Sequence, residues 1–215
     1  TPTTEPTQKE AVAPAADGPK YGGTVTVRIA SDPTNWDSGL NRTGGALLGT
    51  VYQQFISSDW ARRFAGGTVP DRAFVLGSFD DYGPQIAESW EMPSIGVWKL
   101  HIRPGVHWQP VPSAAGALMG NGRLLTADDI VSGFNRLFNR DGKSPGSWIL
   151  ASQPTVAATA TIEKTGPMEV TVKTPAEYMT SFSWLISGAG FYRIYPPDVV
   201  NKYGNMGDWR NAVGT

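Results

Sequence analysis

Residues 86–108, IAESWEMPSIGVWKLHIRPGVHW, are the stretch from which the fold of this chain can be inferred. Side chains alternate between apolar and more polar from residue 97 to residue 103. Three large apolar residues therefore share one face: Trp98, Leu100 and Ile102. This period of two predicts a strand with one buried face. The Pro104-Gly105 pair that follows predicts a turn at its end.

A helix is predicted shortly afterwards, where residues 125–131 read LTADDIV. Thr126 is a favourable N-cap, because its hydroxyl can accept a hydrogen bond from the first turn. Asp129, three residues later, occupies the acidic position of a capping box. Asp128 beside it is favoured by the helix dipole. Apolar residues then recur at helical spacing and predict one buried stripe: Ile130, Val131, Phe134, Leu137 and Phe138.

The order of these segments resembles a known family. The sequence AESWE at residues 87–91, the strand end RPGVHW at 103–108 and TADDI at 126–130 follow one another. They do so in the same way in the extracytoplasmic solute-binding proteins of ABC importers, family 5, which includes oligopeptide, dipeptide and nickel binders. NAVGT at residues 211–215 is similar to a later motif of that family, which continues beyond it. The resemblance covers about residues 21–215 and only the N-terminal part of the family's length.

This resemblance implies a mixed α/β (α+β) fold of the class II periplasmic-binding-protein type. The chain would contain part of lobe I with its inserted subdomain, and the second lobe would be absent. Residues 21–45 would begin lobe I with the first strand and a cleft loop, 46–205 would form the inserted subdomain, and 206–215 would return towards lobe I. Residues 1–20, rich in Thr, Pro and Ala, are expected to be a disordered linker. We therefore expect a fragment of a longer protein.

Further elements are predicted from local patterns. Residues 24–30 alternate and predict a strand, while 47–64 predict a helix with several buried apolar residues. Residues 156–174 predict a hairpin, and 179–185 predict a short helix. Residues 110–124, rich in Pro, Gly, Ala and Ser, depart from the family pattern and are interpreted as an insertion.

Composition excludes several classes of function. The 18 basic and 19 acidic residues give a net charge of -1, without a basic stripe, so no nucleic-acid partner is expected. The chain has no cysteine, which excludes disulfides, thiol catalysis and cysteine-ligated metal within these residues. No apolar run approaches the roughly 18 residues that span a bilayer.

Motifs for catalysis are missing from the sequence. It contains no Gly-x-Ser-x-Gly elbow, no phosphate-binding loop and no His-Glu-x-x-His. His101 and His107 are separated by a predicted turn and are not expected to converge. Asp80-Asp81 could hold a calcium ion, with a solvated turn as the alternative. We therefore expect no enzyme, no catalytic residue, no metal and no cofactor.

The resemblance instead implies a receptor in which two lobes enclose a solute, most often a peptide, for delivery to an ABC permease in the membrane. In the family, the end of the first strand lines the cleft. The candidate ligand-binding residues are therefore Ser31, Asp32, Pro33, Thr34, Asn35 and Trp36. Trp36 could stack on a ligand, whereas an ordinary turn is the alternative explanation for this segment.

The expected location is extracytoplasmic, in the periplasm or at the outer face of the cell membrane. Residues 1–20 resemble the spacer of surface lipoproteins, which implies a tether through a lipidated residue upstream of this chain. Two other functions stay open. One is a structural or accessory subunit of a surface complex that keeps the fold without transport. The other is a carbohydrate-binding surface protein or enzyme, which a platform of exposed tryptophans would favour.

Overall fold

The computed structural model divides the chain into two compact units, Thr1–Ser31 and Asp32–Thr215. The residues whose structure it describes are 22–24, 26, 28, 35–37, 39–40, 45–59, 82–140, 142, 144, 147–180 and 193–215. The fold presented below is that of the second unit. The predicted strand at 24–30, the helix at 179–185 and the Asp80-Asp81 pair lie mostly or wholly outside the described residues.

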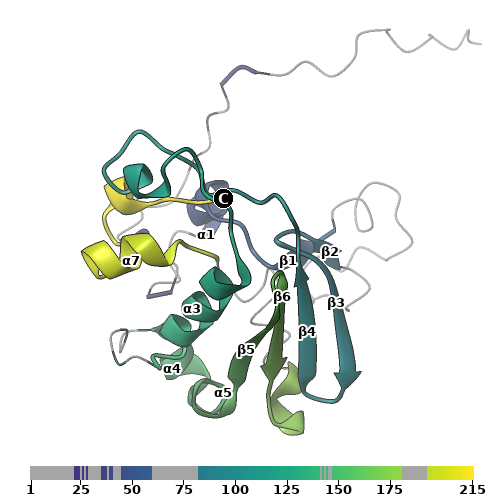
Figure 1. Cartoon of the computed structure of the whole chain (residues 1–215). Coiled ribbons are helices and arrows are strands. Elements are labelled where there is room, and N and C mark those ends of the chain that lie inside the picture. The colour runs from purple at the N-terminus through teal and green to yellow at the C-terminus, as the bar shows by residue number, and fades with distance from the viewer. Residues whose placement is uncertain are drawn as a thin grey trace, which may run out of the picture. The chain divides into compact units, whose positions relative to one another are not determined.

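This unit contains a four-stranded antiparallel sheet (Figure 1). Its strands, in the spatial order β3-β4-β6-β5, are β3 (Ala87–Ser94), β4 (Val97–Ile102), β6 (Glu169–Lys173) and β5 (Thr161–Gly166). The alternation predicted for β4 is confirmed. Trp98, Leu100 and Ile102 are at most 1% exposed, whereas the residues between them are only partly buried. The predicted turn follows, with Gly105 at a φ of 76°.

Helix α3 (Ala127–Leu137) packs beside β5 and β6, along one side of the sheet (Figure 1). Its predicted capping box is present, and the Thr126 N–H donates to the Asp129 carboxylate over 2.9 Å. Four residues of the predicted stripe are buried: Ile130, Phe134, Leu137 and Phe138. Phe134 stacks on Phe55, with ring centroids 5.2 Å apart. Val131 is only half-buried, because it faces a hollow on the surface.

The remaining elements are short. The α-helices are α1 (Gly45–Val51), α4 (Trp148–Ser152), α5 (Pro154–Thr159) and α7 (Pro197–Tyr203). The 3-10 helices are η2 (Gly116–Met119), η3 (Ala176–Tyr178) and η5 (Trp209–Asn211). Strands β1 (Ile56–Ser58) and β2 (Tyr82–Pro84) pair antiparallel as a separate small sheet.

The helix predicted for residues 47–64 ends at Val51, and Ile56–Ser58 forms β1. The prediction is therefore wrong for residues 52–59, while residues 60–64 lie outside the described residues. Four of the five apolar residues expected to be buried are so: Leu48, Tyr52, Phe55 and Ile56 are at most 2% exposed, whereas Val51 is half-buried. A helix end followed by a strand can present such residues to the same core, so the pattern of burial did not distinguish the two structures.

The hairpin predicted for residues 156–174 is confirmed, but its first strand begins only at Thr161. Residues before it form α5, which starts at Pro154. Proline is favoured in a first helical turn, because its fixed φ is helical and its missing N–H is not needed there. Val156 and Ala157 are buried from one side of this short helix, and alternating apolar residues had suggested a strand.

Asp129 also bonds to two residues of the segment after β4, one of which contacts α7. It is 5% exposed and accepts hydrogen bonds from Trp108 Nε1 at 3.3 Å and from both terminal nitrogens of Arg123 at 2.8 and 2.9 Å. Arg123 Nε in turn donates to Asp198 of α7 over 3.0 Å. This network therefore joins the segment after β4 and helix α7 to the start of α3.

Two backbone segments meet closely at the end of α1. Gln109 N–H donates to the Gly214 carbonyl over 2.8 Å, which holds residues 212–215 in place. A Cβ atom on Gly214 would overlap the carbonyl oxygen of Val51. Only glycine permits this approach of the two backbones.

We expect Asp129→Ala to lower the free energy of unfolding by about 2–4 kcal/mol, because it leaves Trp108 Nε1 and part of Arg123 without an acceptor. Asp128→Ala is a matched control in the same helical turn. Its ion pair with Lys164 is exposed, with side chains 70% and 42% accessible, and contributes less than about 1 kcal/mol. Urea denaturation followed by circular dichroism measures both. Equal losses would contradict a central role for Asp129.

We expect Gly214→Ala to lower the free energy of unfolding by about 1–3 kcal/mol, since the added methyl group must push residues 212–215 away from Val51. Gly49→Ala is the control on α1, where a Cβ would make only an ordinary contact with Arg193 at 3.5 Å. That change should be neutral or stabilising by about 0.5–1 kcal/mol, because alanine favours helix. Thermal unfolding compares them, and a harmless Gly214→Ala would refute the constraint.

Candidate functional site

A pocket of about 370 Å³ adjoins the segment that the sequence predicts to bind a ligand. Trp36 lines it, together with residues from α1, from the segment after Trp108 and from η5. Its lining includes Trp36, Val51, Gln109, Pro112, Trp209 and Arg210. The fold thus brings together residues from the two ends and the middle of Asp32–Thr215.

The walls of this pocket combine aromatic surface with a polar edge. Trp36 is half-buried, whereas Trp209 is 63% exposed and has most of its ring surface free for contact. The Arg210 guanidinium lies 5.2 Å from the Trp209 ring centroid and pairs with Asp208 at 3.0 Å. Gln109 is exposed at the same pocket. Such a site suits a small solute with an apolar group and hydrogen-bonding ends.

Asp37, the residue after Trp36, is fully buried and forms an ion pair with Arg136 of α3. Two parallel hydrogen bonds, of 3.0 and 2.6 Å, join the guanidinium to the carboxylate. The same carboxylate accepts the N–H groups of Gly39 at 3.0 Å and Met206 at 3.1 Å. A carboxylate has about four acceptor positions, so these bonds saturate it.

The surroundings of Arg136 keep its guanidinium charged. Burial alone would lower the pKa of Arg136, but the hydrogen bonds and charge of Asp37, together with Tyr195, raise the pKa above its ordinary value. Burial, and next the charge of Asp37, raise the pKa of the neighbouring Tyr52. At neutral pH the guanidinium is therefore charged and the Tyr52 phenol is neutral.

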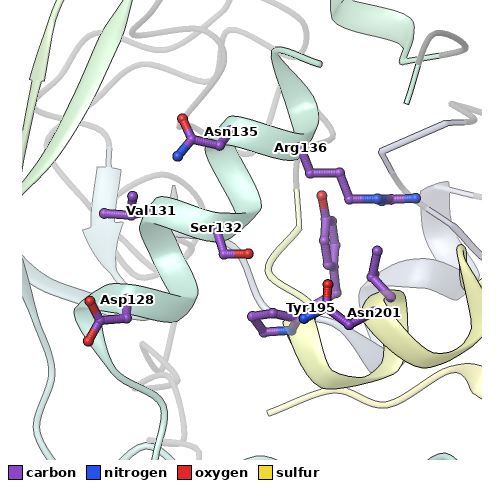
Figure 2. A pocket seen from close by; sticks show the side chains of 9 residues that line it. Asp128, Val131, Ser132, Asn135, Arg136, Tyr195 and Asn201 are labelled. Carbon is purple, nitrogen blue, oxygen red and sulfur yellow. The ribbon is translucent and has the colours of Figure 1, made fainter. Parts of the chain in front are cut away.

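A second hollow, also of about 370 Å³, lies between α3 and α7 (Figure 2). Ser132, Arg136, Tyr195 and Asn201 are among the residues that line it. Figure 2 shows Arg136 leaving α3 and passing over Tyr195, whose ring centroid lies 4.9 Å from the guanidinium carbon. The Tyr195 hydroxyl donates to the Gly133 carbonyl of α3 over 3.3 Å. This hollow therefore borders the same arginine that holds Asp37.

The predicted ligand-binding residues are only partly accounted for. Residues 31–34 (Ser31, Asp32, Pro33 and Thr34) lie outside the described residues. Trp36 lines the first pocket, whereas the Asn35 side chain accepts the Asp37 N–H over 2.7 Å and supports the turn. A binding role for all six stays a prediction. The sequence did not predict Gln109, Trp209 or Arg210 as pocket residues. The high number of tryptophans was the one available signal, and it bears on Trp209 alone.

The two histidines have separate surroundings. His101 Nε2 lies 3.1 Å from a Glu91 carboxylate oxygen, and His107 Nδ1 lies 2.6 Å from the Gly122 carbonyl. Within the described ranges, no three His, Cys, Asp or Glu side chains are arranged to hold a metal ion. None of the helices in those ranges has the length and apolar character of a membrane-spanning segment.

Comparison with known families adds to this geometry. The sequence profile of the bacterial extracellular solute-binding proteins, family 5 Middle, matches residues 81–215, which is more than half of the chain. The chain belongs to this family. The predicted family is thus confirmed, and the family is one of solute-binding proteins rather than enzymes. A comparison with curated protein sequences found no match.

Solved structures of the family share the fold. DppA from Helicobacter pylori in complex with peptide STSA has 17% identity and a TM-score of 0.59 over 86% of this chain and 34% of that chain. OppA from Haemophilus influenzae in complex with RPPGFSPFR has 20% identity and a TM-score of 0.55 over 86% and 33%. NikZ from Campylobacter jejuni in complex with Ni(L-His) has 15% identity and a TM-score of 0.54 over 89% and 30%.

At these identities the likeness shows the fold alone. The predicted fold class is confirmed as a mixed α/β, periplasmic-binding-protein-like fold, of which this chain is a partial lobe. The solute-binding protein spans about a third of the length of the structures it matches. The predicted domain bounds of 21–45, 46–205 and 206–215 stay predictions.

We expect the Asp208 carboxyl to titrate below the ordinary aspartate range. The backbone N–H of Arg210, which donates to it over 2.9 Å, is the largest cause that lowers its pKa. Because the folded pKa is depressed, the stabilisation by this cap of η5 is complete above the unfolded pKa and is lost as pH falls through the folded pKa. An NMR pH titration of the Asp208 carboxyl carbon measures the midpoint.

Arg210→Ala is the control for this titration, since it removes the side chain and keeps the backbone N–H. Most of the lowered pKa should persist in that variant. The explanation is wrong if the Asp208 carboxyl of the unsubstituted protein titrates at the ordinary aspartate pKa. It is also wrong if the lowered pKa returns to the ordinary value after Arg210→Ala, because the side chain would then be the main cause.

Proposed function

We propose that this chain is part of the solute-binding receptor of an ABC importer, which captures a peptide or a similar small solute and delivers it to a membrane permease. Family membership supports the class of function. The observation that carries the proposal is the pocket flanked by Trp36 and Trp209, beside the segment that resembles the family's cleft loop.

The pocket limits the kind of solute. Its volume of about 370 Å³ is near the lower end of the roughly 300–1,000 Å³ typical of ligand pockets. That space holds one or two residues of a peptide, with an apolar side chain against the two tryptophan rings. Gln109 and Arg210 lie where they could bind carbonyl or carboxylate groups. Two of the compared structures contain peptides, which makes peptide the first candidate here.

In the proposed mechanism, this lobe supplies one wall of the cleft and a second lobe closes over the solute. Closure is favoured only to the extent that the solute binds the closed state more tightly than the open one. The permease then recognises the closed form. The receptor is extracytoplasmic, in the periplasm or at the outer face of the membrane, with a lipidated residue upstream as its tether.

A carbohydrate is the second candidate for the bound solute. The two tryptophans that flank one pocket supply flat apolar surfaces, one of them highly exposed. Such surfaces suit the apolar faces of sugar rings as well as peptide side chains. The same receptor mechanism would apply, with a different substrate class.

The test is native mass spectrometry of the whole protein, including whatever sequence naturally adjoins these residues. The probes are a mixture of defined di- to pentapeptides and a mixture of mono- and disaccharides. Retention of peptides, with micromolar or tighter dissociation constants by calorimetry, is the expected result. Retention of sugars alone would mean that the solute is a carbohydrate rather than a peptide. A folded protein that retains neither would reject the receptor function and favour the accessory-subunit alternative.

We expect Trp209→Ala to weaken binding of a retained peptide about tenfold, since loss of one aromatic contact costs about 1–2 kcal/mol. Ile95→Ala is the control, because Ile95 is 69% exposed and lies at the β3–β4 turn, outside the pocket. Calorimetry measures both dissociation constants. Equal affinity of the Trp209→Ala variant and the unsubstituted protein would place the ligand elsewhere.

A further inference from the structure

We propose that Asp37 and Arg136 are positioning residues of the ligand pocket. Neither lines the pocket between the tryptophans, yet their ion pair sets how Trp36 and Trp209 lie relative to each other. The expected effect on solute affinity rests on the proposed function. The expected effect on the positions of Trp36 and Trp209 is independent of it.

The first step is that the Asp37 carboxylate contacts both segments that carry the pocket tryptophans, residues 35–37 and residues 205–209. Trp36 precedes Asp37 directly, and its N–H donates to the Gly207 carbonyl over 3.1 Å. In the opposite direction, the Met206 N–H donates to Asp37 Oδ2 over 3.1 Å. These two hydrogen bonds cross between residues 35–37 and 205–207. The Asp37 carboxylate supplies one of these two bonds, so its position helps to set how the two segments lie relative to each other.

The second step leads from Met206 to Trp209. Asp208 caps η5 by accepting the Arg210 N–H over 2.9 Å, and its carbonyl accepts the Asn211 N–H over 3.0 Å. The chain between Met206 and Trp209 is thus short and hydrogen-bonded at both ends. A displacement of Met206 is passed on to the Trp209 ring with little room to absorb it.

The third step is the cost of breaking the pair. Asp37 is 0% and Arg136 is 6% exposed, so removal of the guanidinium leaves a buried carboxylate without its counterion. Such a group protonates, takes up water or moves outward, and is strongly unfavourable where it stands. Each of these responses weakens its bonds to Met206 and Gly39.

Arg136 is itself held in one direction. Figure 2 shows its side chain extended across Tyr195, which bonds back to Gly133 of the same helix. Because α3 packs against β5 and β6, the ion pair connects Asp37, and through it Met206, to the part of the core between the helix and the sheet. A hydrophobic residue at position 136 would still pack against Tyr195, but it could not donate hydrogen bonds to the Asp37 carboxylate.

The experiment uses the whole protein labelled with 5-fluorotryptophan. Trp36→Phe and Trp209→Phe assign the two pocket resonances in fluorine NMR spectra. We expect Arg136→Met to shift or broaden both resonances and to weaken peptide binding about tenfold. Val172→Ala is the control, because Val172 is buried in β6 opposite Trp98. It should lower the melting temperature and disturb Trp98, while the two pocket resonances and the affinity stay unchanged.

Asp37→Asn combined with Arg136→Met provides the conservative rescue. Removing both charges together avoids an uncompensated buried carboxylate, and the asparagine oxygen can still accept one backbone N–H. We expect the double variant to recover part of the pocket resonances and of the affinity lost in Arg136→Met alone. No recovery would mean that the charge of Asp37 is not what disturbs the pocket.

The outcomes separate this proposal from the proposed function. A lower melting temperature of Arg136→Met with unchanged Trp36 and Trp209 resonances would overturn positioning and leave a purely structural ion pair. Shifted resonances in a protein that retains no solute would uphold positioning of the tryptophans and reject the receptor function. Shifted resonances with unchanged affinity would show that a bound solute does not depend on the two walls.

Discussion

The buried ion pair between Asp37 and Arg136 is the interaction on which the arrangement of this unit depends. The sheet and α3 share an apolar core that needs no charge, and the Asp37 carboxylate adds polar bonds that tie Gly39 and Met206 to Arg136 of α3. Buried charges are tolerated only when their hydrogen bonds are satisfied, which leaves one geometry for the segments that satisfy them. The ion pair therefore fixes the conformation of these segments more than it adds to the net free energy of unfolding.

The local elements of the fold could be predicted because they depend on neighbours in the sequence. The alternation of β4 and the capping box at Thr126 and Asp129 involve residues at most a few positions apart. Residues 154–160 carry two conflicting local signals. Pro154 favours a helix start, and the alternating small residues after it suggested a strand. Leu48, Tyr52, Phe55 and Ile56 are all large apolar residues, so composition did not reveal that the backbone changes from helix to strand between Val51 and Ile56.

The site could be predicted only where a family motif identified it. The motif led to the segment containing Trp36, but nothing in local periodicity relates that segment to Trp209 or to Gln109. Arg136 was equally hidden, because a charged residue on a helix is expected to face solvent, and its burial depends on a distant carboxylate. The same holds for Asp129, whose role as a cap was evident while its bonds to Arg123 and Trp108 were not.

The distance along the chain between Asp37 and Met206 has a consequence for biosynthesis. They are 169 positions apart, and a ribosome adds about 5–20 residues per second, so roughly 8–34 seconds separate the appearance of the two. During that interval β3, β4, β5, β6 and α3 are complete and can fold on each other. The walls of the pocket can meet only after Met206 has been made. In the nascent protein, the sheet and α3 are therefore available well before the pocket that they will support.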